Sequence, residues 1–245
     1  MQIARRMLSP ALAAFLAATA ALLLELLIPH HASAAEAWQG EVAGDEVNVR
    51  SAPSTSAPIV GTLGAGQPVS VSGWAIGERV VGKNDLWAHL SGGGYVYTRG
   101  LTKEVPATPP PPPPAPTSGH WIDVNLTQQI ATAYAGSKPA FSAVVSTGTP
   151  GWETPAGTFP VLRRVPNETM NSSTLRVSVA EGYDLPNVLY TQYFTDWGHA
   201  IHDNYWKWDS PFGVPTSHGC IGMKEQDALA FWNFADVGTP IVIHY

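Results

Sequence analysis

The sequence has 245 residues, of which 44% are hydrophobic and only 13% are charged. The apolar share suffices for a packed core, and the low charge excludes a coiled coil and a charge-rich disordered chain. The formal net charge of −6 argues against nucleic-acid binding, which usually goes with a basic excess. Glycine (23 residues) and proline (22 residues) are abundant, which favours short strands separated by many turns.

The N-terminal segment has the features of a secretory signal peptide. Two arginines precede an apolar run over residues 8–28, and Ala32-Ser33-Ala34 offers a small-residue cleavage site. We expect residues 1–34 to be removed and the mature chain to act outside the cytoplasm, in the cell wall or periplasm, without stable membrane association. The alternative is a membrane anchor, because the 21 residues of the apolar run are enough to span a bilayer.

Short alternating runs occupy residues 36–104, and turn residues divide them. Apolar alternation with period 2 indicates strands, here of a small all-β barrel; the clearest runs are 46–49, 58–60 and 68–71. The stretch from Val47 to Pro53 resembles the opening of bacterial SH3-like domains, as do the later runs 86–90 and 94–97. The resemblance implies a module that binds peptidoglycan or an attached wall polymer, and a passive spacer domain is the alternative.

Residues 105–118 form a proline-rich linker. Such a run adopts polyproline II, which rises ~3.1 Å per residue, so residues 106–116 would span roughly 34 Å. We expect this linker to join two domains that fold independently, one over residues 36–104 and the other over residues 119–245.

The second domain is also rich in strand-like runs. These are residues 121–126, 140–145, 157–162 and 239–245. One helix is predicted after Met223, because Glu225 and Asp227 fall in its first turn and an apolar face follows. The fold class is therefore mainly β with one short helix.

The chemistry-bearing residues are concentrated in one part of this domain. His199, His202, His218 and Cys220 lie within 22 residues, and Cys220 is the only cysteine in the chain. Nucleophilic catalysis by a thiol needs an imidazole close enough to take its proton. The same four side chains are ligand types that zinc accepts, so an exported zinc-dependent hydrolase is the alternative. An inert buried thiol is the third possibility.

The spacing of these residues resembles a known family. Ile201-His202, a gap of 14 residues and Ser217-His218-Gly219-Cys220 are similar to the signature of the L,D-transpeptidase catalytic domain family. Ser146-Thr147-Gly148, residues 154–159 and Asp227-Ala228 extend the resemblance over about residues 120–245. The resemblance implies a β-sandwich-like catalytic domain that needs no metal or other cofactor.

The resemblance also implies a role for each residue of the signature. Cys220 matches the nucleophile and His202 the general base, and Asp203 would orient the imidazole through its backbone carbonyl. The N–H groups of Gly219 and Cys220 would stabilise an oxyanion. Ser217 and His218 match supporting residues, and in an extended strand His218 and Cys220 would lie on one face. His199, outside the signature, is expected to be structural.

One residue departs from the family pattern. The family commonly has Asn or Arg two positions after the cysteine, where this chain has Gly222. A side chain that could contact substrate is therefore missing. Lys207 and Trp208, in the loop of residues 203–216, are candidates to replace that contact.

The function expected from the resemblance is that of a peptidoglycan L,D-transpeptidase in cell wall biogenesis. Cys220 would form a thioester with a stem tetrapeptide and release D-alanine, and an amine of a neighbouring stem would complete a 3→3 cross-link. Water as acceptor would give an L,D-carboxypeptidase, and an amine of a lipoprotein or polymer would give an anchoring enzyme. The sequence leaves the acceptor open, and a non-catalytic wall-binding protein remains the alternative outside enzymes.

Overall fold

The computed structural model describes residues 37–107, 116, 118–171 and 184–245. The expected signal peptide and most of the proline-rich linker lie outside these residues. Residues Glu36–Tyr245 belong to one compact unit. Within the described ranges, no helix is both long and apolar enough to cross a membrane.

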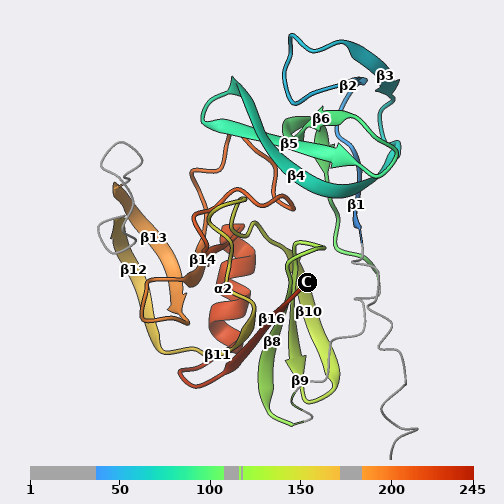
Figure 1. Cartoon of the computed structure of the whole chain (residues 1–245). Coiled ribbons are helices and arrows are strands. Elements are labelled where there is room, and N and C mark those ends of the chain that lie inside the picture. The colour runs from blue at the N-terminus through green and yellow to red at the C-terminus, as the bar shows by residue number, and fades with distance from the viewer. Residues whose placement is uncertain (1–36, 108–115, 117, 172–183) are drawn as a thin grey trace, which may run out of the picture. The chain divides into compact units, whose positions relative to one another are not determined.

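The first part of this unit is one curled antiparallel sheet. Its strands are β1 (Trp38–Val42), β2 (Val47–Arg50), β3 (Ile59–Leu63), β4 (Pro68–Val81), β5 (Asn84–Leu90), β6 (Tyr95–Tyr97) and β7 (Leu101–Thr102), with the 3-10 turn η2 (Thr98–Gly100) before β7. The seven strands lie in the order β3-β2-β6-β5-β4-β1-β7 (Figure 1). Alternate residues such as Val69 and Val71 face a small core, so the expected SH3-like β domain is confirmed.

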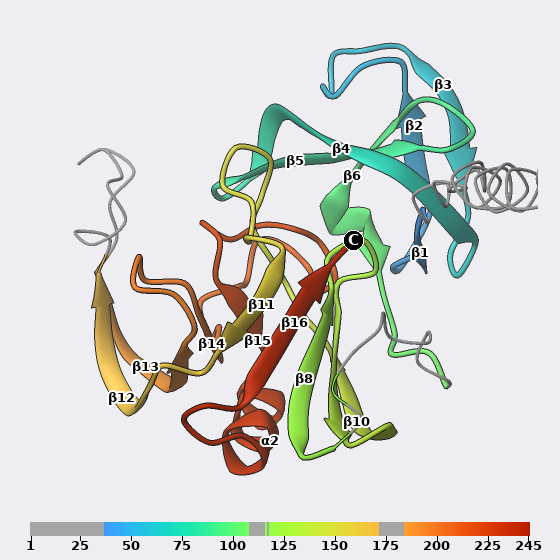
Figure 2. The same cartoon turned by 60° about the horizontal axis from the view of Figure 1, so that its bottom comes forward.

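The second part contains two sheets. The first is made of β8 (His120–Asn125), β9 (Ile130–Ala135), β10 (Lys138–Val144), β11 (Gly157–Pro160) and β16 (Pro240–His244), in the order β10-β9-β8-β16-β11. The second is made of β12 (Arg163–Asn171), β13 (Asp184–Tyr193), β14 (Ala200–Asp203) and β15 (Ile221–Met223), in that order. In each sheet one pair is parallel, β8 with β16 (Figure 2) and β14 with β15.

The helix α2 (Glu225–Phe234) lies between the two sheets (Figure 1). It has Glu225 and Asp227 in its first turn and buries Ala228 and Phe231, as its sequence predicted. The helix shares one hydrophobic core with residues of both sheets. For the described residues, the prediction of a mainly β chain with one short helix is therefore confirmed.

The parallel pair β14 and β15 sets up the candidate site. Its register places Ile201 opposite Ile221 and His202 opposite Gly222. Cys220 directly precedes β15, so the register brings it beside β14, the strand that carries His202.

Candidate active site

The Cys220 thiol is held in a buried, uncharged state. The residue is 6% exposed, and its Sγ–H donates to the carbonyl oxygen of Gly198 at 3.7 Å. Burial raises the thiol pKa to about 11, and a backbone hydrogen bond with Ala200 opposes that rise only in part. The resting group at neutral pH is therefore the thiol and not the thiolate, so attack on a substrate needs a base.

His202 supplies a neutral imidazole with a defined tautomer. Its Nδ1 is hydrogen-bonded to the backbone carbonyl oxygen of Asp203, and a carbonyl can only accept. Nδ1 therefore carries the ring proton, and Nε2 keeps the lone pair that can take a proton. Burial lowers the imidazole pKa to about 4, so the ring stays neutral at physiological pH. Trp206 stacks against it, with ring centroids 5.6 Å apart.

Asp203 contributes to this arrangement through its backbone and through its side chain. The side chain is buried and its Oδ1 accepts a hydrogen bond from the backbone N–H of Leu189 at 2.5 Å. That bond fixes the end of β14 to β13, while the carbonyl of Asp203 orients His202. Burial raises the pKa of the Asp203 carboxyl.

Residues 217–220 form a turn closed by hydrogen bonds. Ser217 Oγ donates to the carbonyl oxygen of Cys220 at 2.6 Å and accepts from the N–H of Gly219 at 3.1 Å. Gly219 has a φ of +108°, which a residue with a Cβ rarely adopts. Because the Gly219 N–H already donates to Ser217, its expected role toward an oxyanion requires that bond to open.

Thr154 clamps this turn from a distant segment. Its hydroxyl donates to the carbonyl oxygen of Gly219 at 2.9 Å and accepts the N–H of Gly148 at 2.9 Å. Sequence reasoning placed Thr154 within the family resemblance but gave it no role. Only the fold reveals the role, since 65 positions separate Thr154 from Gly219.

Gln129 is a second supporting residue that sequence reasoning missed. Its side chain is buried, and Oε1 accepts the backbone N–H of Thr147 at 2.9 Å while Nε2 donates to Thr147 Oγ1 at 2.6 Å. Thr147 in turn accepts the backbone N–H of Ser217 at 2.9 Å. The residue therefore fixes the strand-like segment against which the Ser217–Cys220 turn pairs.

The other two histidines of the cluster lie around the turn. Residues 218–220 are not in a strand, so the condition under which His218 and Cys220 would share a strand face is not met. The His218 ring meets Trp152 edge-on, with centroids 5.2 Å apart. His199 packs against Gly219, since its Nε2 is 2.5 Å from the position that a Cβ there would take.

The zinc alternative requires that several of these side chains converge on one point. In the part of the chain that the structure describes, no group of three or more His, Cys, Asp or Glu side chains could hold a metal ion. His199, His202, His218 and Cys220 therefore do not form the ligand cluster that the zinc-dependent hydrolase would need.

The space beside Gly222 is filled by Asn204. A Cβ at Gly222 would lie 2.7 Å from Asn204 Nδ2 and 3.2 Å from Asn204 Cβ. The two expected replacements point elsewhere: Lys207 Nζ donates to Ser210 Oγ at 3.0 Å and to Thr216 Oγ1, and Trp208 is 68% exposed. Asn204 lies directly after β14, and nothing in the sequence signals this contact.

Comparison with known proteins gives two family matches. Residues 119–243 match the model of the L,D-transpeptidase catalytic domain, and residues 45–102 match that of the bacterial SH3 domain. The probable L,D-transpeptidase 3 of Mycobacterium tuberculosis is 32% identical over 100 residues, which are 40% of this chain and 36% of that protein. The chain thus aligns with just over a third of the length of this curated relative.

Two solved structures are also similar. An L,D-transpeptidase from Mycobacterium smegmatis is 22% identical, with 65% of this chain and 66% of that chain covered and a TM-score of 0.49. L,D-transpeptidase 3 from Mycobacterium tuberculosis, in complex with a faropenem-derived adduct, is 25% identical, with 52% and 60% covered and a TM-score of 0.48. Because the first family model alone matches more than half of the chain, this protein belongs to the L,D-transpeptidase catalytic domain family.

Proposed function

We propose that this protein is an exported peptidoglycan L,D-transpeptidase that uses Cys220 as nucleophile and makes 3→3 cross-links. The observation that carries the proposal is the placement of a buried thiol, directly before β15, beside the strand that bears a neutral imidazole. The tautomer of that imidazole is set by the Asp203 carbonyl, which leaves Nε2 free to accept a proton. Nucleophilic catalysis by a thiol requires a base near the sulfur that can accept its proton, and His202 is the candidate on the adjacent strand.

In the first half-reaction a stem tetrapeptide acylates the enzyme. Cys220 Sγ bonds to the carbonyl carbon that precedes the terminal D-alanine, and the thiol proton moves to His202 Nε2. Backbone N–H groups of the Ser217–Cys220 turn stabilise the oxyanion. The C–N bond then breaks, the D-alanine amine takes the proton from His202, and a thioester remains on Cys220.

In the second half-reaction an amine of a neighbouring stem attacks the thioester. The amine loses its proton to His202, the C–S bond breaks, and the proton returns to the sulfur. The product is a new amide and a regenerated thiol, with no net redox change. Water in place of the amine would release a tripeptide, which is L,D-carboxypeptidase activity, and a polymer amine would give anchoring.

The pKa shifts at the site agree with general-base catalysis. At pH 7 a thiol with a pKa of about 11 and an imidazole with a pKa of about 4 are both neutral, so no thiolate–imidazolium pair is stored in the resting enzyme. The proton moves as the sulfur attacks. We therefore propose that the approach of the substrate drives ionisation.

Two further parts of the proposal concern location and targeting. Residues 1–34 act as an export signal, and the SH3-like domain holds the enzyme on wall polymer. Sedimentation of the purified chain with intact sacculi tests the second part. Binding that survives the loss of catalysis in Cys220→Ala supports it, whereas a chain that stays in the supernatant refutes it.

The experiment that tests the reaction is mass analysis of products from purified disaccharide tetrapeptide. We expect free D-alanine and a dimer joined through a 3→3 bond. Cys220→Ala should make neither, and Cys220→Ser, which keeps the size of the side chain, should be strongly impaired. Products formed by Cys220→Ala at the wild-type rate would overturn the proposal, and tripeptide without dimer would show that water is the acceptor.

A further inference from the structure

We infer that the SH3-like domain is a positioning element of the active site, because it holds the loop that joins the base to the nucleophile turn. This active-site loop, residues 204–216, begins directly after Asp203 and ends directly before Ser217. The inference rests on the proposed roles of Cys220 and His202. It differs from the expectation of two independent domains that a proline-rich linker merely tethers.

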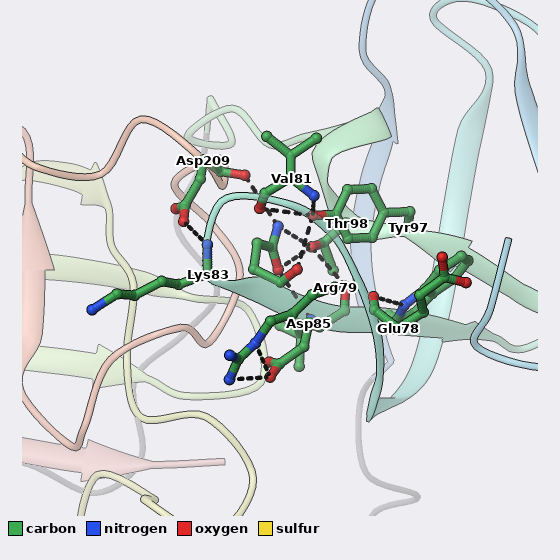
Figure 3. A network of polar contacts seen from close by, with 11 residues as sticks. Glu78, Arg79, Val81, Lys83, Asp85, Tyr97, Thr98 and Asp209 are labelled. Carbon is green, nitrogen blue, oxygen red and sulfur yellow. Dashed lines mark hydrogen bonds and ion pairs between the residues drawn. The ribbon is translucent and has the colours of Figure 1, made fainter. Parts of the chain in front are cut away.

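The first anchor is a set of hydrogen bonds from the hairpin of β4 and β5. The backbone N–H of Lys83 donates to Asp209 Oδ2 at 2.9 Å, and Asn84 Nδ2 donates to the carbonyl oxygen of Asp209 at 3.2 Å. Figure 3 shows the Asp209 carboxylate directed at the backbone nitrogen of Lys83. Arg99, after β6, adds a third bond to the carbonyl oxygen of Trp208 at 3.0 Å.

The hairpin turn is itself rigid and packs directly on the loop. The Tyr97 hydroxyl accepts the N–H of Val81 at 3.1 Å and donates to the carbonyl oxygen of Asn84 at 3.0 Å (Figure 3). Gly82 has a φ of +59°, and a Cβ there would lie 2.7 Å from Asp209 Oδ2. The turn therefore presents fixed donors at close range, so the loop binds a preformed surface.

The second anchor is apolar and lies at the other end of the loop. Val214 is 1% exposed and belongs to the hydrophobic core of the SH3-like domain, together with Trp38 and Leu101. The Trp38 Nε1–H donates to the carbonyl oxygen of Gly213 at 2.7 Å. A Cβ at Gly213 would lie 2.8 Å from Lys103 Cβ. One loop residue thus completes the core of the other domain.

The same loop is also tied to the catalytic domain. Lys207 is partly buried and donates to Ser210 Oγ and to Thr216 Oγ1. Thr216 adjoins Ser217, which closes the nucleophile turn. The backbone N–H of Gly213 donates to the carbonyl oxygen of Val145 at 2.8 Å. Freedom gained by the loop would therefore reach the residues beside both Cys220 and His202.

The chain offers matched variants that test this inference. Arg99→Ala with Trp38→Phe removes one arginine and one indole donor that reach the loop. Arg50→Ala with Trp121→Phe removes the same two donor types, but Arg50 donates to the carbonyl oxygen of Ala57 at 2.8 Å and the Trp121 indole donates to that of Gly136 at 2.7 Å, so neither bond reaches the loop. Both tryptophans are buried, so loss of packing is matched.

We expect the loop-directed double variant of the full chain to lower the rate constant of Cys220 acylation at saturating tetrapeptide by about tenfold, the effect of two lost positioning hydrogen bonds. The control double variant should change it less than about twofold, although both should lower the melting temperature to a similar extent. Amide hydrogen exchange in residues 204–216 should accelerate only in the loop-directed variant. Arg99→Ala against Arg50→Ala gives the same comparison without a change in a buried tryptophan.

Equal acylation rates and equal exchange in the two double variants would overturn the inference while leaving the proposed function intact. If the wild-type chain shows no acylation of Cys220 at all, the proposed function is refuted instead. Hydrogen exchange would then still decide whether the SH3-like domain orders the loop.

Discussion

Replacement of Gly222 by alanine should destabilise the protein through one neighbour, Asn204. The new Cβ would lie 2.7 Å from Asn204 Nδ2, a distance at which the amide must move. Overpacking of a buried site costs about 1–3 kcal/mol, and the lower backbone entropy of the unfolded chain returns about 0.4–1 kcal/mol. Because Gly222 is not in the left-handed region, the backbone adds no strain. The net loss should be roughly 1–2 kcal/mol.

A double-mutant cycle isolates this contact. In an Asn204→Gly background the neighbouring side chain is gone, so Gly222→Ala should cost nothing or stabilise slightly, and the coupling free energy should be roughly 1–2 kcal/mol. The measurement is denaturant unfolding of the four proteins, followed by tryptophan fluorescence. Gly73→Ala is the control, because no atom lies within 4 Å of the Cβ it would add.

Two results would refute this reasoning. If Gly222→Ala costs as much in the Asn204→Gly background as in the wild type, Asn204 is not what fills the space. If Gly73→Ala destabilises the chain as much as Gly222→Ala, the effect belongs to strand glycines in general and not to this contact.

Three further predictions concern the ionisable groups. Alkylation of Cys220 by iodoacetamide should accelerate about tenfold per pH unit between about pH 7 and 10, because burial raises the thiol pKa to about 11. A rate that no longer rises above about pH 8 would show that the resting enzyme already holds Cys220 as a thiolate. His202→Ala should slow acylation by about 10²–10⁴-fold, the usual share of positioned proton transfer, whereas His199→Ala should slow it far less; equal losses would show that His199 takes part in the transfer. Burial lowers the pKa of His202 to about 4 in the folded chain, against 6.5 for the free group. Between pH 6.5 and pH 4 the unfolded chain therefore binds more protons than the folded chain. The free energy of unfolding should fall by roughly 3 kcal/mol as the pH drops across this range. In His202→Gln the free energy of unfolding should not show this fall with pH. A fall of the same size in the variant would assign it to another titrating group.

The parts of the fold that sequence reasoning predicted are those with strong local signals. The helix after Met223 was found because acidic residues and an apolar face coincide within ten residues. Strands β12 and β13 were not predicted, because Pro166 and Pro186 interrupt them and their pairing with each other defines them. Strand β9 was missed because small alanines weaken its alternation.

In the candidate site too, the sequence predicted some residues and not others. The sequence predicted the signature from His202 to Cys220, because these residues lie close together in the chain and their side chains have specific chemistry. The supporting residues Gln129, Thr154 and Asn204 carry no such mark, since polar residues like these are common in loops. Their roles follow from contacts that only the folded chain creates.

The contact between the two domains was the largest feature of the fold that the sequence did not predict. A proline-rich linker indicates separation, but it says nothing about whether the domains pack together afterwards. Val214 looks like an ordinary loop residue in sequence, and its partners in the other domain are more than 100 positions away. Burial of this kind is a tertiary property without a local pattern.

The central claim is that Cys220 forms an acyl-enzyme, and mass spectrometry of the Cys220 peptide tests it most directly. The purified chain would be mixed with stem tetrapeptide, quenched in acid within the first turnover, digested and analysed. The account predicts that the Cys220 peptide gains the mass of the tripeptidyl group, in step with the release of one D-alanine, and that the gain decays when an amine acceptor is added. Release of D-alanine while the Cys220 peptide stays unmodified would contradict the account.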